Sequence, residues 1–199
     1  MFEHLRRHIP KRIEEEQEHV SAVLIPLIQK DDGYHILFEV RSKKLRRQPG
    51  EVCFPGGRVE QGETTLETAV RETKEELLIG SKQLAIYGAL DYFLSPAKAR
   101  IEPFLGELTG YDGRFNTAEV DSVFTVPLRF FQETEPDLYY NDVLIQPPDD
   151  FPFSDIPGGR DYPWAGGRYE VCFYRYQGRI IWGMTAKILL NNLPYLKLP

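Results

Sequence analysis

The chain has 199 residues, of which 42% are hydrophobic and 27% charged, and its formal net charge is −6. This length fits one ordinary domain with or without a short arm, and the composition is typical of a folded chain, not a disordered one. The negative charge excludes a global positive field for nucleic acid, although a local basic patch is compatible with it. Two cysteines, Cys53 and Cys172, are too few for a disulfide scaffold or a cysteine-only zinc site, which indicates reduced thiols.

No segment has the pattern of a membrane span or an export signal. The longest apolar stretch, residues 23–28, is far shorter than about 18 residues and contains Pro26. The first seven residues are charged, and no apolar segment follows them. We therefore expect a cytoplasmic protein with no membrane partner, while the sequence leaves an organelle interior open.

The sequence predicts an N-terminal helical arm over residues 1–18 and a single domain over residues 19–199. No internal repeat or linker divides the domain. Periodicity and turn residues predict a hairpin from Val20–Ile28 and Tyr34–Val40, joined by a turn at Gly33. Further along we expect strands at 84–92, 101–109 and 122–126, a hairpin from 169–175 and 179–182, and a closing helix at 185–192.

A long loop is predicted over residues 146–168, which are rich in Pro, Gly and Asp. Long loops in compact domains are often lids or binding loops. The aromatic residues of this loop either line a ligand pocket or anchor the loop to the body of the domain. They are Phe151, Phe153, Tyr162 and Trp164.

The clearest helix is predicted over Thr64–Leu77. Thr64 and Glu67 fit a capping box, in which each side chain satisfies a free backbone N–H group of the first turn. Helical spacing predicts one mostly apolar face, made of Leu66, Ala69, Val70, Thr73 and Leu77.

The same helix carries Glu72, Glu75 and Glu76, which fall within an arc of roughly 100° opposite the apolar face. The like charges of Glu72 and Glu76 repel each other, and a bound cation would turn that repulsion into attraction. Oxygen ligands suit hard ions such as Mg²⁺ or Mn²⁺. Helix spacing alone favours the commoner explanation, a solvated charged face, so the surrounding residues decide.

Those residues resemble the Nudix box, G-x5-E-x7-R-E-U-x-E-E-x-G-U, in which U is a bulky aliphatic residue. Thr73 departs from the box by replacing an aliphatic residue, and we expect slightly weaker packing there. Leu78 replaces the glycine that ends the helix, a role that we expect Gly80 to take. All the charged positions are present. The box reads Gly57, Glu63, Arg71, Glu72, Thr73, Glu75, Glu76, Leu78 and Ile79 in this chain.

This resemblance implies an α/β fold, a Nudix-type α/β/α sandwich with a mixed sheet. It also implies hydrolysis of a nucleoside diphosphate linked to another group, with Mg²⁺ or Mn²⁺ bound by a loop–helix–loop. By their positions in the box, Glu72, Glu75 and Glu76 would be the metal ligands. Glu63 would support the site or complete the metal shell, and Arg71 would orient Glu75.

The physical chemistry agrees with such a site. A bound metal ion screens an anionic diphosphate and lowers the pKa of a bound water, and a carboxylate then takes the proton of that water. Gly56 and Gly57 would let the loop backbone approach the metal and the phosphates closely. The base varies within the family. Glu119 is our leading candidate outside the box, and a surface carboxylate without a role is an equal alternative.

The segment before the box resembles the motif of the coenzyme A pyrophosphatase subgroup, L-L-T-x-R-S/A-x3-R-x3-G-x3-F-P-G-G. The spacing from Leu37 to Gly57 matches without a gap. Phe38 and Glu39 depart from the motif, and Glu39 adds a negative charge where the motif has threonine. Residues 181–186, Ile-Trp-Gly-Met-Thr-Ala, are similar to the C-terminal segment of the same subgroup.

The second resemblance implies a small-molecule substrate, coenzyme A or a derivative, cleaved to 3′,5′-ADP and 4′-phosphopantetheine. Basic residues cluster between Arg41 and Arg47, and Arg side chains suit phosphate oxygens. We expect Arg41 and Arg46, the motif positions, to bind substrate. A solvated basic loop is the alternative, and nucleic acid is disfavoured because no aromatic residues interleave with the basic ones. A homodimer is an expectation of the family alone.

Two rival functions stay open. The first is a Nudix hydrolase that acts on ADP-ribose, NADH or a dinucleoside polyphosphate. The second is a catalytically silent Nudix-fold domain that binds a nucleotide or a protein. The complete set of carboxylates argues against it.

Cys53 lies beside the predicted site, and we expect it to be a small buried residue, not a nucleophile.

Overall fold

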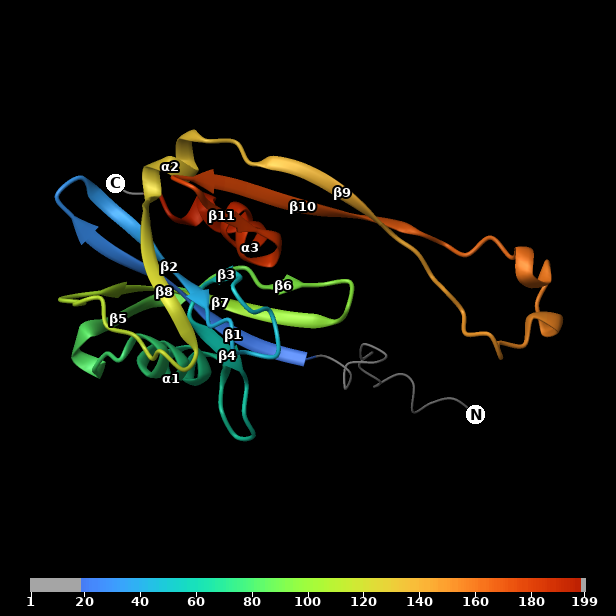
Figure 1. The fold of residues 1–199 in the computed structure, drawn as a ribbon, viewed down its shortest axis with the longest axis horizontal. Helices are drawn as coiled ribbons and strands as arrows, with labels where there is room; N and C mark the ends of the chain where they lie inside the picture. The colour runs from blue at the N-terminus through green and yellow to red at the C-terminus, as the bar shows by residue number, and fades with distance from the viewer. Residues whose placement is uncertain (1–18, 198–199) are drawn as a thin grey trace, which may run out of the picture.

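The computed structural model describes residues 19–197, which fold around a mixed eight-stranded sheet (Figure 1). The strand order is β3-β2-β1-β7-β5, with β4 paired to β1, β6 to β7 and β8 to β2. Strands β1 and β7 are parallel, whereas β1 and β2 form the predicted antiparallel hairpin. The strands are β1 (His19–Lys30), β2 (Gly33–Arg41), β3 (Val52–Cys53), β4 (Gly56–Arg58), β5 (Leu84–Ala89), β6 (Phe93–Leu94), β7 (Ala99–Leu108) and β8 (Val120–Pro127). The predicted arm over residues 1–18 lies outside the described residues.

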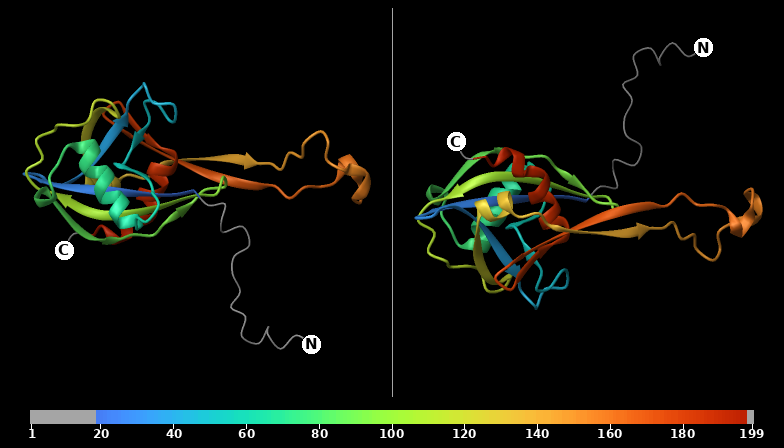
Figure 2. Two further views of the ribbon diagram at one scale, coloured as in Figure 1. Left: turned by 90° about the horizontal axis from the view of Figure 1, so that it is seen from below. Right: turned by 90° about the horizontal axis from the view of Figure 1, so that it is seen from above.

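Helices and a second sheet cover the two faces of this sheet (Figures 1 and 2). Helix α1 (Thr65–Leu77) lies on one face, and helices α2 (Leu128–Glu133) and α3 (Gly183–Asn192) lie on the other. The second sheet is antiparallel and consists of β9 (Asp137–Val143), β10 (Gly167–Tyr176) and β11 (Arg179–Trp182). Short 3-10 turns are η3 (Ser81–Gln83), η4 (Phe153–Asp155), η5 (Gly159–Asp161) and η6 (Leu193–Tyr195). The predicted α/β architecture with a mixed sheet is confirmed.

Strand β1 shows how the sequence builds the layers. Its side chains alternate between the faces of the sheet, and both faces are buried. Leu24 packs in one hydrophobic cluster with Ala69 of α1, whereas Ile25 packs in another with Leu189 of α3. Because helices cover both faces, the strand is a continuous apolar run, as the sequence pattern of residues 20–28 predicts. None of the helices between residues 19 and 197 is long and apolar enough to cross a membrane.

The segment over residues 146–168 departs from both explanations given for it. Strands β9 and β10 extend away from the body of the domain, and this segment forms the far tip of their hairpin (Figures 1 and 2). Trp164 makes edge-to-face contacts with Phe151 and Tyr162, and Phe153 packs edge to face on Phe151. The four aromatic residues therefore contact one another at the tip of the hairpin.

The ends of α1 were partly predictable. The capping box is confirmed, since the Thr64 hydroxyl accepts from the N–H of Glu67 and the Glu67 carboxylate accepts from the N–H of Thr64. The expectation that Gly80 ends the helix is wrong. Leu78 itself adopts the left-handed conformation at the C-cap, with φ 51° and ψ 42°, and Gly80 instead precedes η3. Leu66, a member of the predicted apolar face, is exposed.

Glycine should be more stable than alanine at position 78. A side chain in the left-handed region costs about 1–2 kcal/mol, and half of the Leu78 surface is already exposed. We expect Leu78→Gly to raise the free energy of unfolding by about 0.5–1 kcal/mol relative to Leu78→Ala in urea unfolding. A glycine variant no more stable than the alanine variant would contradict the strain at this position.

Candidate active site

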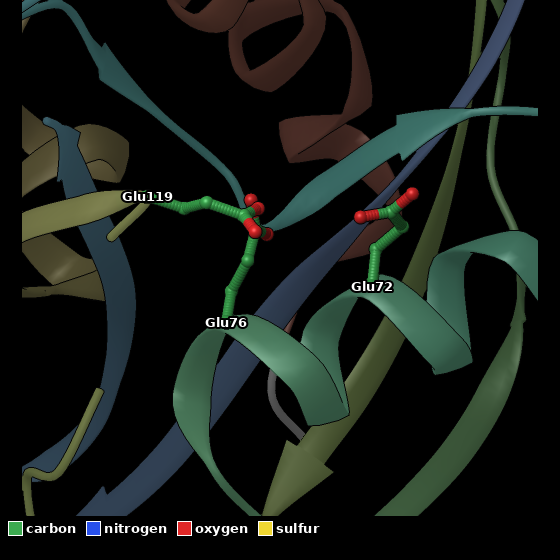
Figure 3. A group of neighbouring side chains, drawn as sticks. All are labelled: Glu72, Glu76 and Glu119. Carbon is green, nitrogen blue, oxygen red and sulfur yellow. The ribbon is translucent and has the colours of Figure 1, made fainter. Parts of the chain in front are cut away.

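Three carboxylates converge between α1 and the start of β8. Glu72 and Glu76 come from consecutive turns of α1, and Glu119 immediately precedes β8 (Figure 3). Each of the three offers an oxygen atom, and these atoms all lie within 4.8 Å of one another. Residues separated by more than 40 positions in the sequence are thus brought to one point.

Backbone contacts hold two of these side chains in place. The Glu76 carboxylate accepts a hydrogen bond of 2.8 Å from the N–H of Gly56, at the start of β4. The carbonyl oxygen of Glu76 accepts from the N–H of Asn116 at 2.7 Å, and a turn from Asn116 leads directly to Glu119. The helix, the glycine loop and the loop before β8 are therefore joined through Glu76.

The position of Glu76 corrects an expectation. The sequence places this residue on the solvent side of α1, yet only 2% of its surface is exposed. The Gly56 contact shows why, since the loop into β4 packs over this part of the helix. The helix periodicity alone contains no information about that loop.

The charges of the cluster are unfavourable as they stand. Burial raises the pKa of Glu76 well above its ordinary value, and the neighbouring Glu39, Glu72 and Glu119 carboxylates raise it further. Burial also raises the pKa of Glu72, although its ion pair with Arg71 opposes that shift. An oxygen-rich group of mutually repelling carboxylates fits a hard divalent cation, which would remove the repulsion.

Arg71 donates hydrogen bonds to two glutamates of the Nudix-box pattern, Glu63 and Glu72. Its guanidinium donates to both oxygens of Glu63, at 2.7 and 3.0 Å, and to Glu72 at 2.9 Å. The hydrogen bond from Arg71 holds the pKa of Glu63 down at about 2, and a bond from Thr68 lowers it further. Glu63 is therefore joined to Glu72 through Arg71.

Glu75 stands apart from the three converging carboxylates. More than half of its side chain is exposed, and its closest partner is Arg71 at 3.4 Å. The contact expected between Arg71 and Glu75 is present, but it is longer than the bonds of Arg71 to Glu63 and Glu72. The structure thus places Glu119, and not Glu75, beside Glu72 and Glu76.

Gly56 and Gly57 each allow a different group to come close to the backbone. A Cβ atom on Gly57 would lie 2.2 Å from a carboxylate oxygen of Glu72, so a side chain there would displace that carboxylate. Gly56 has φ 154°, and a Cβ atom on it would lie 2.3 Å from the carbonyl oxygen of Ala22 in the paired strand β1. Gly57 therefore leaves room for the site, and Gly56 leaves room for the strand pairing beneath it.

Glu39 is a buried carboxyl group near the site. The sequence motif identified it only as a departure, since the motif has threonine at this position. Glu39 is 1% exposed, it accepts a hydrogen bond from the Cys53 thiol at 3.2 Å, and its second oxygen has no hydrogen-bond partner. Burial raises the pKa of Glu39 and also that of Cys53. A thiol held protonated in this way is not a nucleophile, in agreement with the sequence analysis.

The basic segment begins beside the carboxylates. The N–H of Ser42 donates to the carbonyl oxygen of Glu119 at 2.7 Å, and backbone bonds of Arg41 with Gly50 and Glu51 close the loop. Arg41 is half-buried at the base of this loop, whereas Arg46 is exposed. The two arginines thus occupy a loop next to the site, and Arg41 is the nearer of the two along the chain to the Glu119 contact.

Comparison with known proteins identifies the family. A sequence profile of the NUDIX domain matches residues 18–139. The chain belongs to the Nudix family. The match includes α1, both glycines and Glu119, so all three converging carboxylates lie within the Nudix domain.

Individual relatives support this assignment. The chain is 36% identical to the peroxisomal coenzyme A diphosphatase NUDT7 of Mus musculus over 65% of its own length and 55% of the relative's. It is 36% identical to the mitochondrial coenzyme A diphosphatase NUDT8 of Homo sapiens, over 84% of the chain and 65% of the relative. Its identity to the Nudix hydrolase NudL of Photorhabdus laumondii is 32%, over 90% of the chain and 86% of the relative. The chain therefore spans about half to two thirds of the two diphosphatases.

Removing the charge of Glu76 should stabilise the metal-free Nudix domain. Because the folded-state pKa lies above the ordinary value of 4.5, the contribution of this group to stability is complete below pH 4.5 and is lost as the pH rises through the raised pKa. We expect Glu76→Gln to raise the free energy of unfolding at pH 8 in EDTA by on the order of 2 kcal/mol, and by less at pH 5.

Urea unfolding at both pH values measures this effect, with Glu133→Gln, an exposed glutamate at the end of α2, as the matched control. Millimolar Mn²⁺ should then stabilise the wild type and the control but not Glu76→Gln. A variant less stable than the wild type at pH 8 in EDTA would show that the Glu76 charge is compensated without a cation.

Proposed function

We propose that this Nudix domain hydrolyses the diphosphate bond of coenzyme A or its derivatives, in a metal-dependent reaction that gives 3′,5′-ADP and 4′-phosphopantetheine or its derivative. The observation that carries the proposal is the convergence of Glu72, Glu76 and Glu119 beside the basic segment that starts at Arg41. The names of the mouse and human relatives support coenzyme A as the substrate class.

In this proposal Mg²⁺ or Mn²⁺ is held by Glu72 and Glu76, and Glu75 joins them by turning away from its long contact with Arg71. When bound, the ion neutralises the diphosphate and lowers the pKa of a bound water. Glu119 lies close enough to both ligands to accept the proton of that water. Glu63 acts through Arg71, which positions Glu72.

Arg41 and Arg46 bind substrate phosphates in this proposal, and Gly57 keeps the space in which the diphosphate meets the carboxylates. Coenzyme A has a 3′-phosphate in addition to its diphosphate, so an exposed arginine has a phosphate to bind at some distance from the metal. A cytoplasmic location stays a prediction, because the two diphosphatase relatives have names that place them in peroxisomes and mitochondria.

A substrate panel tests the reaction. We expect release of 3′,5′-ADP from coenzyme A to require Mg²⁺ or Mn²⁺, to stop in EDTA, and to be faster than AMP release from ADP-ribose or NADH. Product chromatography measures all of these. Faster turnover of ADP-ribose or NADH would overturn the assignment to coenzyme A, and no turnover of any substrate would favour a silent binding domain.

The 3′-phosphate contact is tested at Arg46. We expect Arg46→Ala to raise KM for coenzyme A by roughly tenfold, the effect of losing one charge-assisted hydrogen bond, and to leave KM for dephospho-coenzyme A nearly unchanged. Arg47→Ala is the matched control from the same exposed loop. Equal effects of Arg46→Ala on the two substrates would remove Arg46 from this role.

A further inference from the structure

Two segments that resemble the coenzyme A subgroup meet at a cavity of about 570 Å³. One wall is formed by residues 49–52, where the basic segment leads into β3, and the opposite wall is formed by Ile180 and Trp182 of β11 with Phe173 of β10. The hydroxyl of Thr185 donates to the carbonyl oxygen of Val52 at 3.1 Å and fixes the two walls together. The fold thus brings residues 181–186 against the segment before the Nudix box.

The lining of the cavity suits a planar ring. Trp182 and Phe173 are stacked, with centroids 5.5 Å apart and an interplanar angle of 18°. Trp182 is 40% exposed and lines the cavity, so surface of this side chain is available to a ligand. The rest of the lining is mostly apolar and includes one acidic residue, Glu51, and one basic residue, Arg179.

The cavity lies close to the carboxylate site but on the other side of β3. Val40 and Val52 are paired in register and both line the cavity, whereas their neighbours Glu39 and Cys53 are paired on the opposite face. Gly56, which contacts Glu76, is four residues after Val52 and therefore no more than about 14 Å from it. Since β3 is an edge strand, one extended ligand can reach both sites around this edge.

We propose that this cavity binds the adenine ring of the substrate, stacked on Trp182, while the diphosphate lies at the three carboxylates. This inference rests on the proposed function and assigns a place to one half of its substrate. Adenine has the planar face that the aromatic platform accepts, and its amino group can donate a hydrogen bond to the Glu51 carboxylate. The flexible pantetheine arm has no such face, so the stacked Trp182 and Phe173 favour the base over the arm.

Calorimetry with the two reaction products tests the assignment separately from turnover. We expect Trp182→Ala to weaken binding of 3′,5′-ADP by roughly 5- to 150-fold, the usual loss for one stacked base, and Trp182→Phe to retain most of the affinity. Binding of 4′-phosphopantetheine should not change. Trp164→Ala is the matched control, because this tryptophan lies in the segment at the tip of the β9–β10 hairpin.

A second variant covers the case in which Trp182→Ala does not fold. Ile180→Trp adds an indole to the cavity from a half-exposed position, and it should abolish 3′,5′-ADP binding. Wild-type affinity of Trp182→Ala for 3′,5′-ADP, loss of 4′-phosphopantetheine binding instead, or no binding of adenine nucleotides by the wild type would each overturn the inference. The proposed function can fail alone, because an enzyme specific for ADP-ribose would still bind 5′-AMP in a way that depends on Trp182.

Discussion

The hydrogen bond from the backbone of Gly56 to the buried carboxylate of Glu76 is the contact on which the site depends. It joins α1 to β4, and β4 is in turn held by its pairing with β1. A carboxyl group placed there meets little water and several other carboxylates, which raises its pKa. The fold thereby concentrates negative charge around Glu76, and a bound cation would stabilise the ionised carboxylates.

Because of Arg71, the uncompensated negative charge is confined to Glu76 and Glu119. The Arg71 guanidinium neutralises Glu63 through two hydrogen bonds and also contacts Glu72, so this side of the helix is already compensated. Glu76 and Glu119 have no ion pair of this kind with Arg71 and face each other across the gap between α1 and β8 (Figure 3). A cation that binds there completes a charge arrangement whose remaining parts are fixed by regular structure.

Strand β3 separates two chemically different surfaces. On one face of this edge strand Cys53 contacts the buried Glu39, and on the other Val52 lines the cavity that Trp182 also lines. A substrate with a charged diphosphate and a planar base needs both kinds of surface within a short distance. The short pairing of β3 with β2 and the bond from Thr185 to Val52 supply that arrangement.

The sequence by itself determined the features that depend on neighbouring residues. These include the β1–β2 hairpin, the capping box at Thr64, the carboxylate-bearing helix and the glycines beside it, because turn chemistry, periodicity and motif spacing act over a few residues. Only the tertiary structure decided that Glu76 is buried, that Glu119 joins it in place of Glu75, and that Trp182 lies against Val52. These facts depend on which loop covers a helix and which strands lie side by side. Such contacts link residues distant in the chain, and no local pattern specifies them.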